Sequence, residues 1–130
     1  MKITSLDHIT INCKDLEASI RFYEGLLGLE KSDVVDLGDH TLHYYKLPGL
    51  KTRLELINYN NEQKALSTGN TDVGIYRHVA FETDDLEGFY KTINEAGYKI
   101  NLPPTMIPQI GKRIILIVDP NGVEIEFIQK

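Results

Sequence analysis

The sequence has a single cysteine, no long apolar run and no cluster of basic residues. Cys13 alone cannot form an intramolecular disulfide, which fits a reducing compartment. No apolar stretch approaches the ~18–20 residues needed to cross a bilayer, and the opening MKITSLDH lacks the apolar segment of a signal peptide. The formal net charge of −5 disfavours nucleic acid and anionic membranes, because both attract clustered Lys and Arg. We therefore expect a cytoplasmic protein that binds small molecules, with no nucleic-acid or membrane partner.

What the chain does have is a balanced globular composition and an internal repeat. Its 130 residues are 42% apolar and 25% charged, which is typical of one soluble domain, residues 1–130. The stretch DHITINCKDLE at 7–17 returns as RHVAFETDDLE at 77–87. At this offset of 70, His8 aligns with His78 and Asp15 with Asp85. A duplicated unit is therefore predicted. The sequence contains no G-x-S-x-G, P-loop or G-x-G-x-x-G motif.

Each copy is predicted to contain one strand, one helix and about three further strands. In the first copy we expect a strand over 5–13, followed by a helix that Asp15 caps and Gly28 ends. Three further strands are expected over 31–38, 40–48 and 52–59. In the second copy we expect a strand over 77–84, a helix over 85–98, an irregular connection over 98–109, and strands over 112–119 and 123–130. Module 1 would span about 1–59, a polar linker 60–74, and module 2 about 75–130. The predicted fold is α+β: two tandem βαβββ modules forming a curved, mostly antiparallel sheet around a metal-binding cleft.

Alternation of side chains along the strands places possible metal ligands on one face. His8 and His78 lie on the first strand of each copy, and Glu55 and Glu126 on the last, at offsets of 70 and 71. Glu124 shares a face with Glu126, but Glu126 better matches Glu55. Two imidazoles and two carboxylates suit zinc or nickel, and also manganese, cobalt or iron. The plainer alternative for any one of these side chains is a solvated strand face; their joint recurrence favours a site.

Other side chains are candidates for substrate contacts. Tyr44 and Tyr45 point to opposite faces of one strand, so one of them can line the cleft while the other packs. Met106 can form an apolar wall, and Arg53 and Arg113 can bind an anionic substrate, although an exposed strand edge is the plainer interpretation for each. The substrate-binding candidates taken from this set are Tyr45, Arg53, Met106 and Arg113. Cys13 is interpreted as a packed thiol rather than a nucleophile.

Four stretches resemble one family over nearly the whole chain. They are LDHITINCKDLEASIRFYEGLLGLE, TRLELIN, YRHVAFETDDLE and DPNGVEIEFIQ, and they are similar to the vicinal oxygen chelate superfamily. That superfamily includes glyoxalase I (lactoylglutathione lyase), methylmalonyl-CoA epimerase, fosfomycin-resistance proteins, ring-cleaving dioxygenases and bleomycin-binding (bleomycin-resistance) proteins. The resemblance identifies the superfamily and does not select a member.

The resemblance implies roles for particular residues. It places the metal ligands at His8, Glu55, His78 and Glu126, a set most like that of glyoxalase I and the epimerases. Ring-cleaving dioxygenases generally use two histidines and one carboxylate, and bleomycin-binding members lack the ligands. In the implied chemistry, one divalent ion per site holds two adjacent substrate oxygens while a carboxylate moves a proton through an enediolate. Glu126 would be the acid/base, with Glu55 as its counterpart.

One position departs from the glutathione-dependent pattern. Those glyoxalase I enzymes tend to carry an arginine four residues after the first histidine, where this chain has Asn12, a neutral candidate for contacting substrate. The expected function is therefore a metal-dependent lyase or isomerase of the glyoxalase I type with its substrate left open. The alternatives are a metal-dependent dioxygenase or fosfomycin-resistance-type enzyme, and a non-catalytic drug-binding protein. A homodimer is expected, with the site formed within one chain or shared between two.

Overall fold

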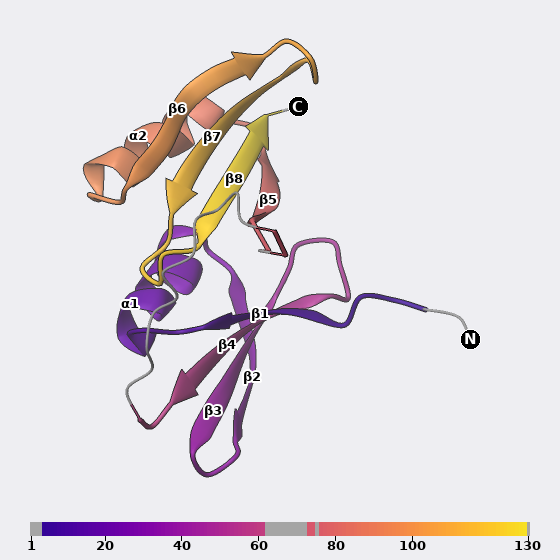
Figure 1. Cartoon of the computed structure of the whole chain (residues 1–130), viewed down its shortest axis with the longest axis vertical. Coiled ribbons are helices and arrows are strands. Elements are labelled where there is room, and N and C mark those ends of the chain that lie inside the picture. The colour runs from indigo at the N-terminus through magenta and orange to yellow at the C-terminus, as the bar shows by residue number, and fades with distance from the viewer. Residues whose placement is uncertain (1–3, 62–72, 75, 130) are drawn as a thin grey trace. The chain divides into compact units, whose positions relative to one another are not determined.

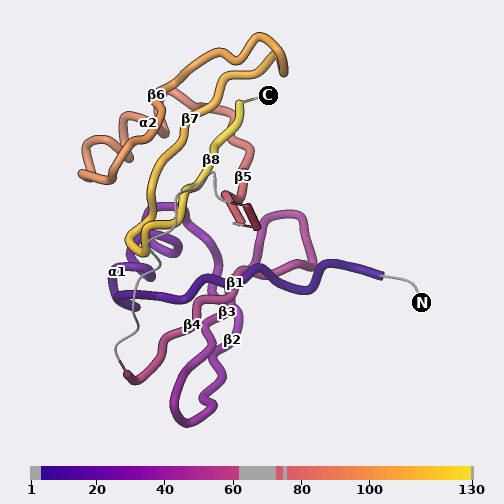
Figure 2. The backbone as a smooth tube through the Cα atoms, viewed as in Figure 1, coloured from indigo at the N-terminus to yellow at the C-terminus, as the bar shows by residue number. Residues whose placement is uncertain are grey.

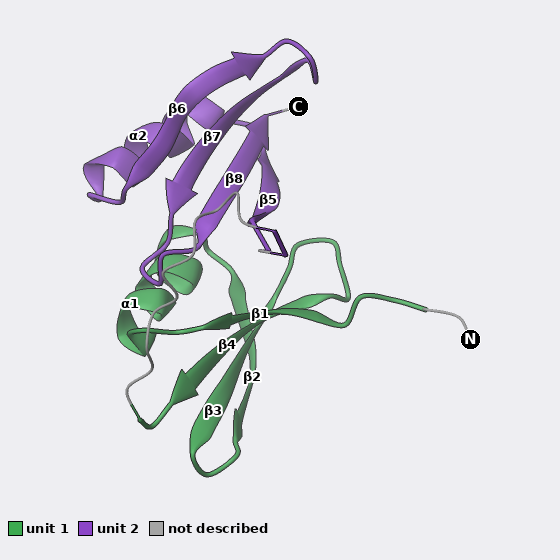
Figure 3. Cartoon of the chain, viewed as in Figure 1, with its two compact units in different colours: residues 1–65 green, residues 66–130 purple. Residues whose placement is uncertain are grey.

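The computed structural model describes residues 4–61, 73–74 and 76–129, which Figure 1 shows as coloured ribbon. The chain divides into two compact units, Met1–Ala65 and Leu66–Lys130, coloured separately in Figure 3. The linker expected over 60–74 lies largely outside the described residues. Within the described part of the chain, every helix is too short or too polar to cross a membrane.

Each unit has the predicted order of strand, helix and three strands. The first unit contains β1 (His8–Asn12), α1 (Leu16–Ile20), the π-helix η1 (Arg21–Leu26), β2 (Glu30–Asp36), β3 (His40–Lys46) and β4 (Arg53–Tyr59). The second contains β5 (His78–Thr83), α2 (Leu86–Glu95), β6 (Ile100–Ile107), β7 (Lys112–Val118) and β8 (Glu124–Gln129). The βαβββ prediction is confirmed for both copies.

The two sheets repeat one topology. The strand orders are β1-β4-β3-β2 and β5-β8-β7-β6, and the chain path can be followed in Figure 2. In each sheet the first and last strands of the unit pair in parallel, while the other neighbours pair antiparallel. The first strand of each unit therefore lies directly beside its last. This neighbourhood brings His8 beside β4 and His78 beside β8.

The helix ends follow the sequence signals. Asp15 Oδ1 accepts a hydrogen bond from the backbone N–H of Ala18 at 3.2 Å, and Asp85 Oδ1 accepts one from Gly88 at 3.0 Å. Both carboxylates thus satisfy otherwise unpaired N–H groups at a helix start. Gly28 and Gly97 have φ of 69° and 83°, the left-handed conformation that glycine adopts without strain after a helix.

Two details differ from the predictions. The first helix is not α-helical throughout, because its second half forms the π-helix η1. The stretch 98–109, predicted to be irregular, contains the strand β6, so that prediction was wrong. Prolines 103 and 104 are tolerated because β6 is an edge strand and its pairing with β7 shifts register at two places.

One face of each sheet packs against its helix to form a core. The fully buried side chains of the first unit include Phe22, Tyr23, Tyr45 and Leu56, and those of the second include Leu86, Ile93, Ile115, Ile117 and Ile125. In β4 and β8, core residues alternate with residues that point to the other face, as side chains in strands do. Glu55 and Glu126 therefore lie on the sheet faces opposite the helices.

Candidate metal centre

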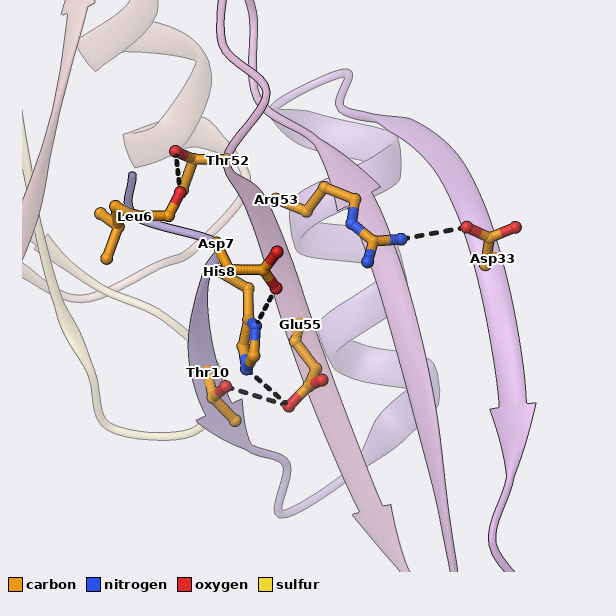
Figure 4. Close-up of polar contacts among 8 residues, drawn as sticks. All are labelled: Leu6, Asp7, His8, Thr10, Asp33, Thr52, Arg53 and Glu55. Atoms are coloured by element: carbon orange, nitrogen blue, oxygen red, sulfur yellow. Dashed lines mark hydrogen bonds and ion pairs between the residues drawn. The ribbon is translucent and has the colours of Figure 1, made fainter. Parts of the chain in front are cut away.

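The first half-site consists of one histidine and one glutamate on adjacent strands. His8 begins β1, and the parallel register pairs it with Arg53 while pairing Thr10 with Glu55. His8 Nε2 lies 3.8 Å from Glu55 Oε1, as Figure 4 shows. Glu55 is only 4% exposed, and its Oε1 accepts a 3.0 Å hydrogen bond from the Thr10 hydroxyl. A buried carboxylate is stable when hydrogen bonds replace lost hydration.

A second hydroxyl group also interacts with Glu55. Tyr44 on β3 is the antiparallel register partner of Glu55. The pKa of Tyr44 is raised, first by its hydrogen bond to Glu55 and then by burial. The Tyr44 ring meets the His8 ring edge to face at 6.2 Å. Glu55 is thus held between hydroxyl groups from the strands on both sides of it.

The other ring nitrogen of His8 contacts a carboxylate, and an arginine lies on the same face of the sheet. His8 Nδ1 lies 2.7 Å from Asp7 Oδ2, and this hydrogen bond lowers the pKa of Asp7 despite the opposing effect of desolvation.

Arg53 places its guanidinium 4.0 Å from the centre of the Tyr44 ring. Its Nη1 is 3.0 Å from Asp33 Oδ2. Arg53 is therefore oriented by a cation–π contact and an ion pair on the same face as the half-site.

The second half-site repeats the first with different neighbours. The register of β5 and β8 pairs His78 with Glu124 and Ala80 with Glu126. Glu126 therefore occupies the place in its sheet that Glu55 occupies in the first one. His78 Nε2 lies 2.7 Å from Glu126 Oε2. The register partners of Glu126 are Ala80 and, on β7, Leu116; they correspond to Thr10 and Tyr44 but carry no hydroxyl.

Glu124 supports His78 from the neighbouring strand. Its Oε1 lies 3.3 Å from His78 Nδ1 and 3.2 Å from Arg77 Nε. Asn101 Nδ2 donates to its Oε2 at 3.0 Å. Burial raises the pKa of Glu124, but the hydrogen bonds from Asn101, Arg77 and His78 outweigh it, and the pKa is lowered. Glu124 is thus a buried carboxylate that stays ionised at neutral pH.

The donor atoms of both half-sites suit a divalent ion. Two ligands about 2.1 Å from one ion and at right angles to each other lie roughly 3 Å apart. The Nε2–carboxylate distances of 3.8 and 2.7 Å lie on either side of that value. Among residues 4–61, 73–74 and 76–129, no group of three or more His, Cys, Asp or Glu is arranged to hold a metal. Each half-site, taken by itself, places one imidazole nitrogen beside one glutamate carboxylate.

The predicted substrate-binding residues divide between the two sheet faces. Asn12 and Arg53 lie on the faces of β1 and β4 that carry His8 and Glu55. Tyr45 is fully buried and donates a 3.0 Å hydrogen bond to Glu24 Oε2; its pKa rises to about 12 through burial and this bond. A side chain without exposed surface does not contact a ligand. The choice of Tyr45 is therefore corrected to Tyr44, its neighbour on the opposite face.

Arg113 and Met106 also lie away from the half-site of their unit. Arg113 pairs with Glu87 on α2, which places its guanidinium on the helix-covered face. Met106 is the register partner of Arg113 and is half exposed. Met106 lies in the stretch predicted to be irregular, for which strand alternation assigns no face. Met106 and Arg113 therefore lie together on the helix-covered face of their sheet, and substrate contact by either residue stays a prediction.

Several contributors to the half-sites were not singled out from sequence. They are Asp7, Thr10, Arg77 and Asn101. For Thr10 a signal existed, because it shares a strand face with His8. For Asn101 there was none, since its segment was not recognised as a strand.

The chain is a duplicated βαβββ protein. Each unit carries a histidine on its first strand and a glutamate at the same register place on its last. The sequence profile of the Glyoxalase/Bleomycin resistance protein/Dioxygenase superfamily matches residues 5–127. The chain belongs to this superfamily. The predicted assignment to the vicinal oxygen chelate proteins is thereby confirmed.

Relatives cover the chain almost end to end. The uncharacterized protein YwbC of Bacillus subtilis is 33% identical over 96% of this chain and 97% of its own length. Lactoylglutathione lyase of Neisseria meningitidis is 30% identical over 95% of this chain and 88% of its own. A solved glyoxalase family protein from Enterococcus faecalis superposes with a TM-score of 0.78 at 23% identity, covering 98% of this chain and 99% of that one. This last likeness shows the fold.

Proposed function

We propose that the protein is a metal-dependent lyase or isomerase of the glyoxalase I type. It would move a proton between neighbouring carbons of a small substrate that presents two adjacent oxygens, by way of an enediolate. The observation that supports this best is the repeated pair: a histidine Nε2 beside a glutamate carboxylate at the same register place in both units. Similarity to a lactoylglutathione lyase favours the same chemistry.

His8, Glu55, His78 and Glu126 together would hold one divalent ion, zinc or nickel first, with manganese, cobalt or iron as alternatives. The two half-sites would meet within one chain or between the chains of a homodimer. When bound, the ion supplies positive charge that stabilises negative charge developing on a substrate oxygen. The protein groups must supply the proton transfer.

Glu55 and Glu126 have different neighbours, which suit the two glutamates to different roles. Glu55 is anchored by the hydroxyl groups of Thr10 and Tyr44, so it suits a ligand that stays in place. Glu126 has Ala80 and Leu116 at the corresponding positions; it lacks these two hydroxyl donors, contacts His78 Nε2, and suits a group that carries a proton to and from a substrate carbon. Glu126 is therefore the proposed general acid and base. This argument from contacts agrees with the role that the family resemblance implies.

The face around the first half-site would select the substrate. Arg53 projects a positive charge beside Glu55, oriented by Tyr44 and Asp33. Asn12 can donate a hydrogen bond to a carboxylate or carbonyl but adds no charge. We therefore propose a substrate with one anionic group near its reacting oxygens. Asn12 in place of an arginine makes glutathione the less favoured carrier.

Elemental analysis of the purified chain is the first test. About one divalent ion per chain is expected, lost in His8→Ala and in His78→Ala. An absence of bound ion, together with no gain in melting temperature on adding zinc, nickel, manganese or cobalt, would contradict the proposal and favour the drug-binding alternative. Iron dependence with oxygen uptake would point to a dioxygenase.

The proton transfer itself is tested in deuterated water. Metal-loaded protein is incubated with candidate 2-oxo thiol adducts and acyl thioesters, and the product is examined by NMR. Deuterium appearing at the carbon beside the carbonyl is expected, because the proton carried by a carboxylate exchanges with solvent. Glu126→Gln should abolish this incorporation while retaining the ion. Consumption of a free thiol without any exchange would instead indicate a fosfomycin-resistance-type transferase.

A further inference from the structure

We propose that Asp7 and Glu124 are positioning residues, each holding the Nδ1–H of one histidine so that Nε2 is left to bind the ion. The inference rests on the proposed metal site and extends it to the groups that orient its histidines. A neutral imidazole has one N–H, and the partner of one nitrogen decides which nitrogen keeps the proton. Carboxylates commonly play this part behind metal-binding histidines.

In the first unit the carboxylate comes from the residue before the histidine. Asp7 Oδ2 lies 2.7 Å from His8 Nδ1. The opposite side of the ring, with Nε2, faces Glu55 Oε1 at 3.8 Å, as Figure 4 shows. A proton on Nδ1 is therefore stabilised by Asp7, while Nε2 turns toward the proposed ligand.

In the second unit the carboxylate comes from the neighbouring strand. Glu124 Oε1 lies 3.3 Å from His78 Nδ1, and Nε2 lies 2.7 Å from Glu126 Oε2. Each ring thus has a carboxylate near both nitrogens, with the shorter contact at Nδ1 in His8 and at Nε2 in His78. Glu124 is the register partner of His78, in the place that Arg53 occupies opposite His8.

The acidic and the basic residue next to each histidine occupy opposite positions in the two units. The residue before the histidine is Asp7 in the first unit and Arg77 in the second. The residue opposite the histidine is Arg53 in the first and Glu124 in the second. A simple copy would carry the same charge at the same place. What both units share is the contact: a carboxylate at Nδ1, supplied from different positions.

The two carboxylates are not equally restrained. The Glu124 side chain is 7% exposed and is also held by Arg77 and Asn101. The Asp7 side chain is 80% exposed, so water competes for its contact with His8. Removing Glu124 should therefore disturb ion binding more than removing Asp7.

The test measures zinc affinity of the full chain by competition with a chromogenic chelator. Asp7→Asn keeps a neutral acceptor, Asp7→Ala removes it, and Glu124→Gln removes the buried charge. We expect a several-fold loss of affinity for Asp7→Ala, a smaller loss for Asp7→Asn, and a loss of about 10- to 100-fold for Glu124→Gln. Asp39→Asn is the matched control, because Asp39 Oδ1 makes the same contact with the adjacent His40 Nδ1 at 2.5 Å outside either half-site; its affinity should match wild type.

A second readout distinguishes positioning from general stability. In zinc-loaded, histidine-labelled protein, nitrogen–proton NMR should show both ligand histidines protonated at Nδ1 and bound through Nε2. Asp7→Ala should alter the Nδ1 signal of His8 alone, and Glu124→Gln that of His78 alone. Should Glu124→Gln fail to fold, Asn101→Ala, which loosens Glu124 without removing its charge, is expected to weaken zinc binding several-fold.

The outcomes separate this inference from the proposed function. Wild-type protein that binds no zinc would refute the metal site, and this inference would fall with it. If wild type binds zinc and Asp7→Ala and Glu124→Gln bind it as tightly, with unchanged ring-nitrogen signals, the positioning roles are wrong while the metal site stands.

Discussion

The Thr10 hydroxyl on β1 donates a 3.0 Å hydrogen bond to Oε1 of Glu55 on β4, across a parallel strand pair that exists in both units. In the second unit the same register place holds Ala80, opposite Glu126. The Thr10 hydroxyl is thus one of the contacts that differ between the two half-sites. A hydrogen bond to a charged group contributes about 1.5–3 kcal/mol, so Glu55 is held by a donor for which Glu126 has no counterpart on β5.

Exchanging this hydroxyl between the halves should alter the two glutamates in opposite ways. Ala80→Thr would give Glu126 a donor, and we expect turnover to fall about tenfold with bound metal unchanged. Thr10→Ala would free Glu55 and should weaken metal affinity by about tenfold, because the loss of roughly 1.4 kcal/mol corresponds to that factor. Chelator competition and turnover are measured on both variants. Equal effects of the two substitutions on both quantities would contradict the division of roles.

The two carboxylates should also separate in amide variants. Glu126→Gln cannot accept a proton, so turnover should fall by about 10²- to 10⁴-fold, the range for losing a general acid–base group, while metal remains bound. Glu55→Gln should lose metal, because it removes a fixed anionic ligand. Metal content and turnover are compared after dialysis that removes the unbound ion. Glu124→Gln is a third variant, because Glu124 lies on the same strand as Glu126 and is proposed to bind no ion directly; its metal affinity should fall, while its turnover at saturating metal should be retained. Turnover retained in Glu126→Gln would refute its assignment.

Much of this arrangement followed from sequence because it depends on local patterns. The offsets of 70 and 71 residues identified the repeat, and alternation along strands placed His8 and Glu55 on one face. The same rule could not choose between Tyr44 and Tyr45, because adjacent residues simply take opposite faces and both are tyrosine. That choice depends on which face the helix covers. The contact between Glu124 and Asn101 required a strand, β6, whose two prolines concealed it.

The adjacent tyrosines offer a matched pair of substitutions. Tyr45→Phe removes a buried hydroxyl bonded to Glu24, so the free energy of unfolding should fall by about 1 kcal/mol with metal affinity unchanged. Tyr44→Phe removes a donor to Glu55 and should weaken metal affinity while changing stability little. Urea denaturation and zinc titration of both variants check this. The converse pattern would place Tyr45, not Tyr44, at the site.

A buried histidine on the face of its sheet opposite the first half-site should make stability depend on pH. His43 on β3 is 9% exposed; its Nε2 lies 2.9 Å from the Thr41 hydroxyl, and its Nδ1 has no hydrogen-bond partner among the described residues. Burial lowers the pKa of His43, and the charge of Lys31 lowers it further. The folded protein therefore binds a proton on this ring less readily than the unfolded chain, whose histidines titrate near pH 6.5.

The sign of the effect follows from proton linkage. Above pH ~6.5 the ring is neutral in both states, and its contribution is fully present. As the pH falls below that value the unfolded chain takes up the proton first, so the free energy of unfolding should decrease, by at most about 1.4 kcal/mol per pH unit. Metal-free His43→Leu should show a shallower decrease between pH 7 and 5 in urea denaturation. His40→Leu is the control, because His40 begins the same strand but pairs with the exposed Asp39. A slope unchanged in His43→Leu would show that other groups cause the acid sensitivity.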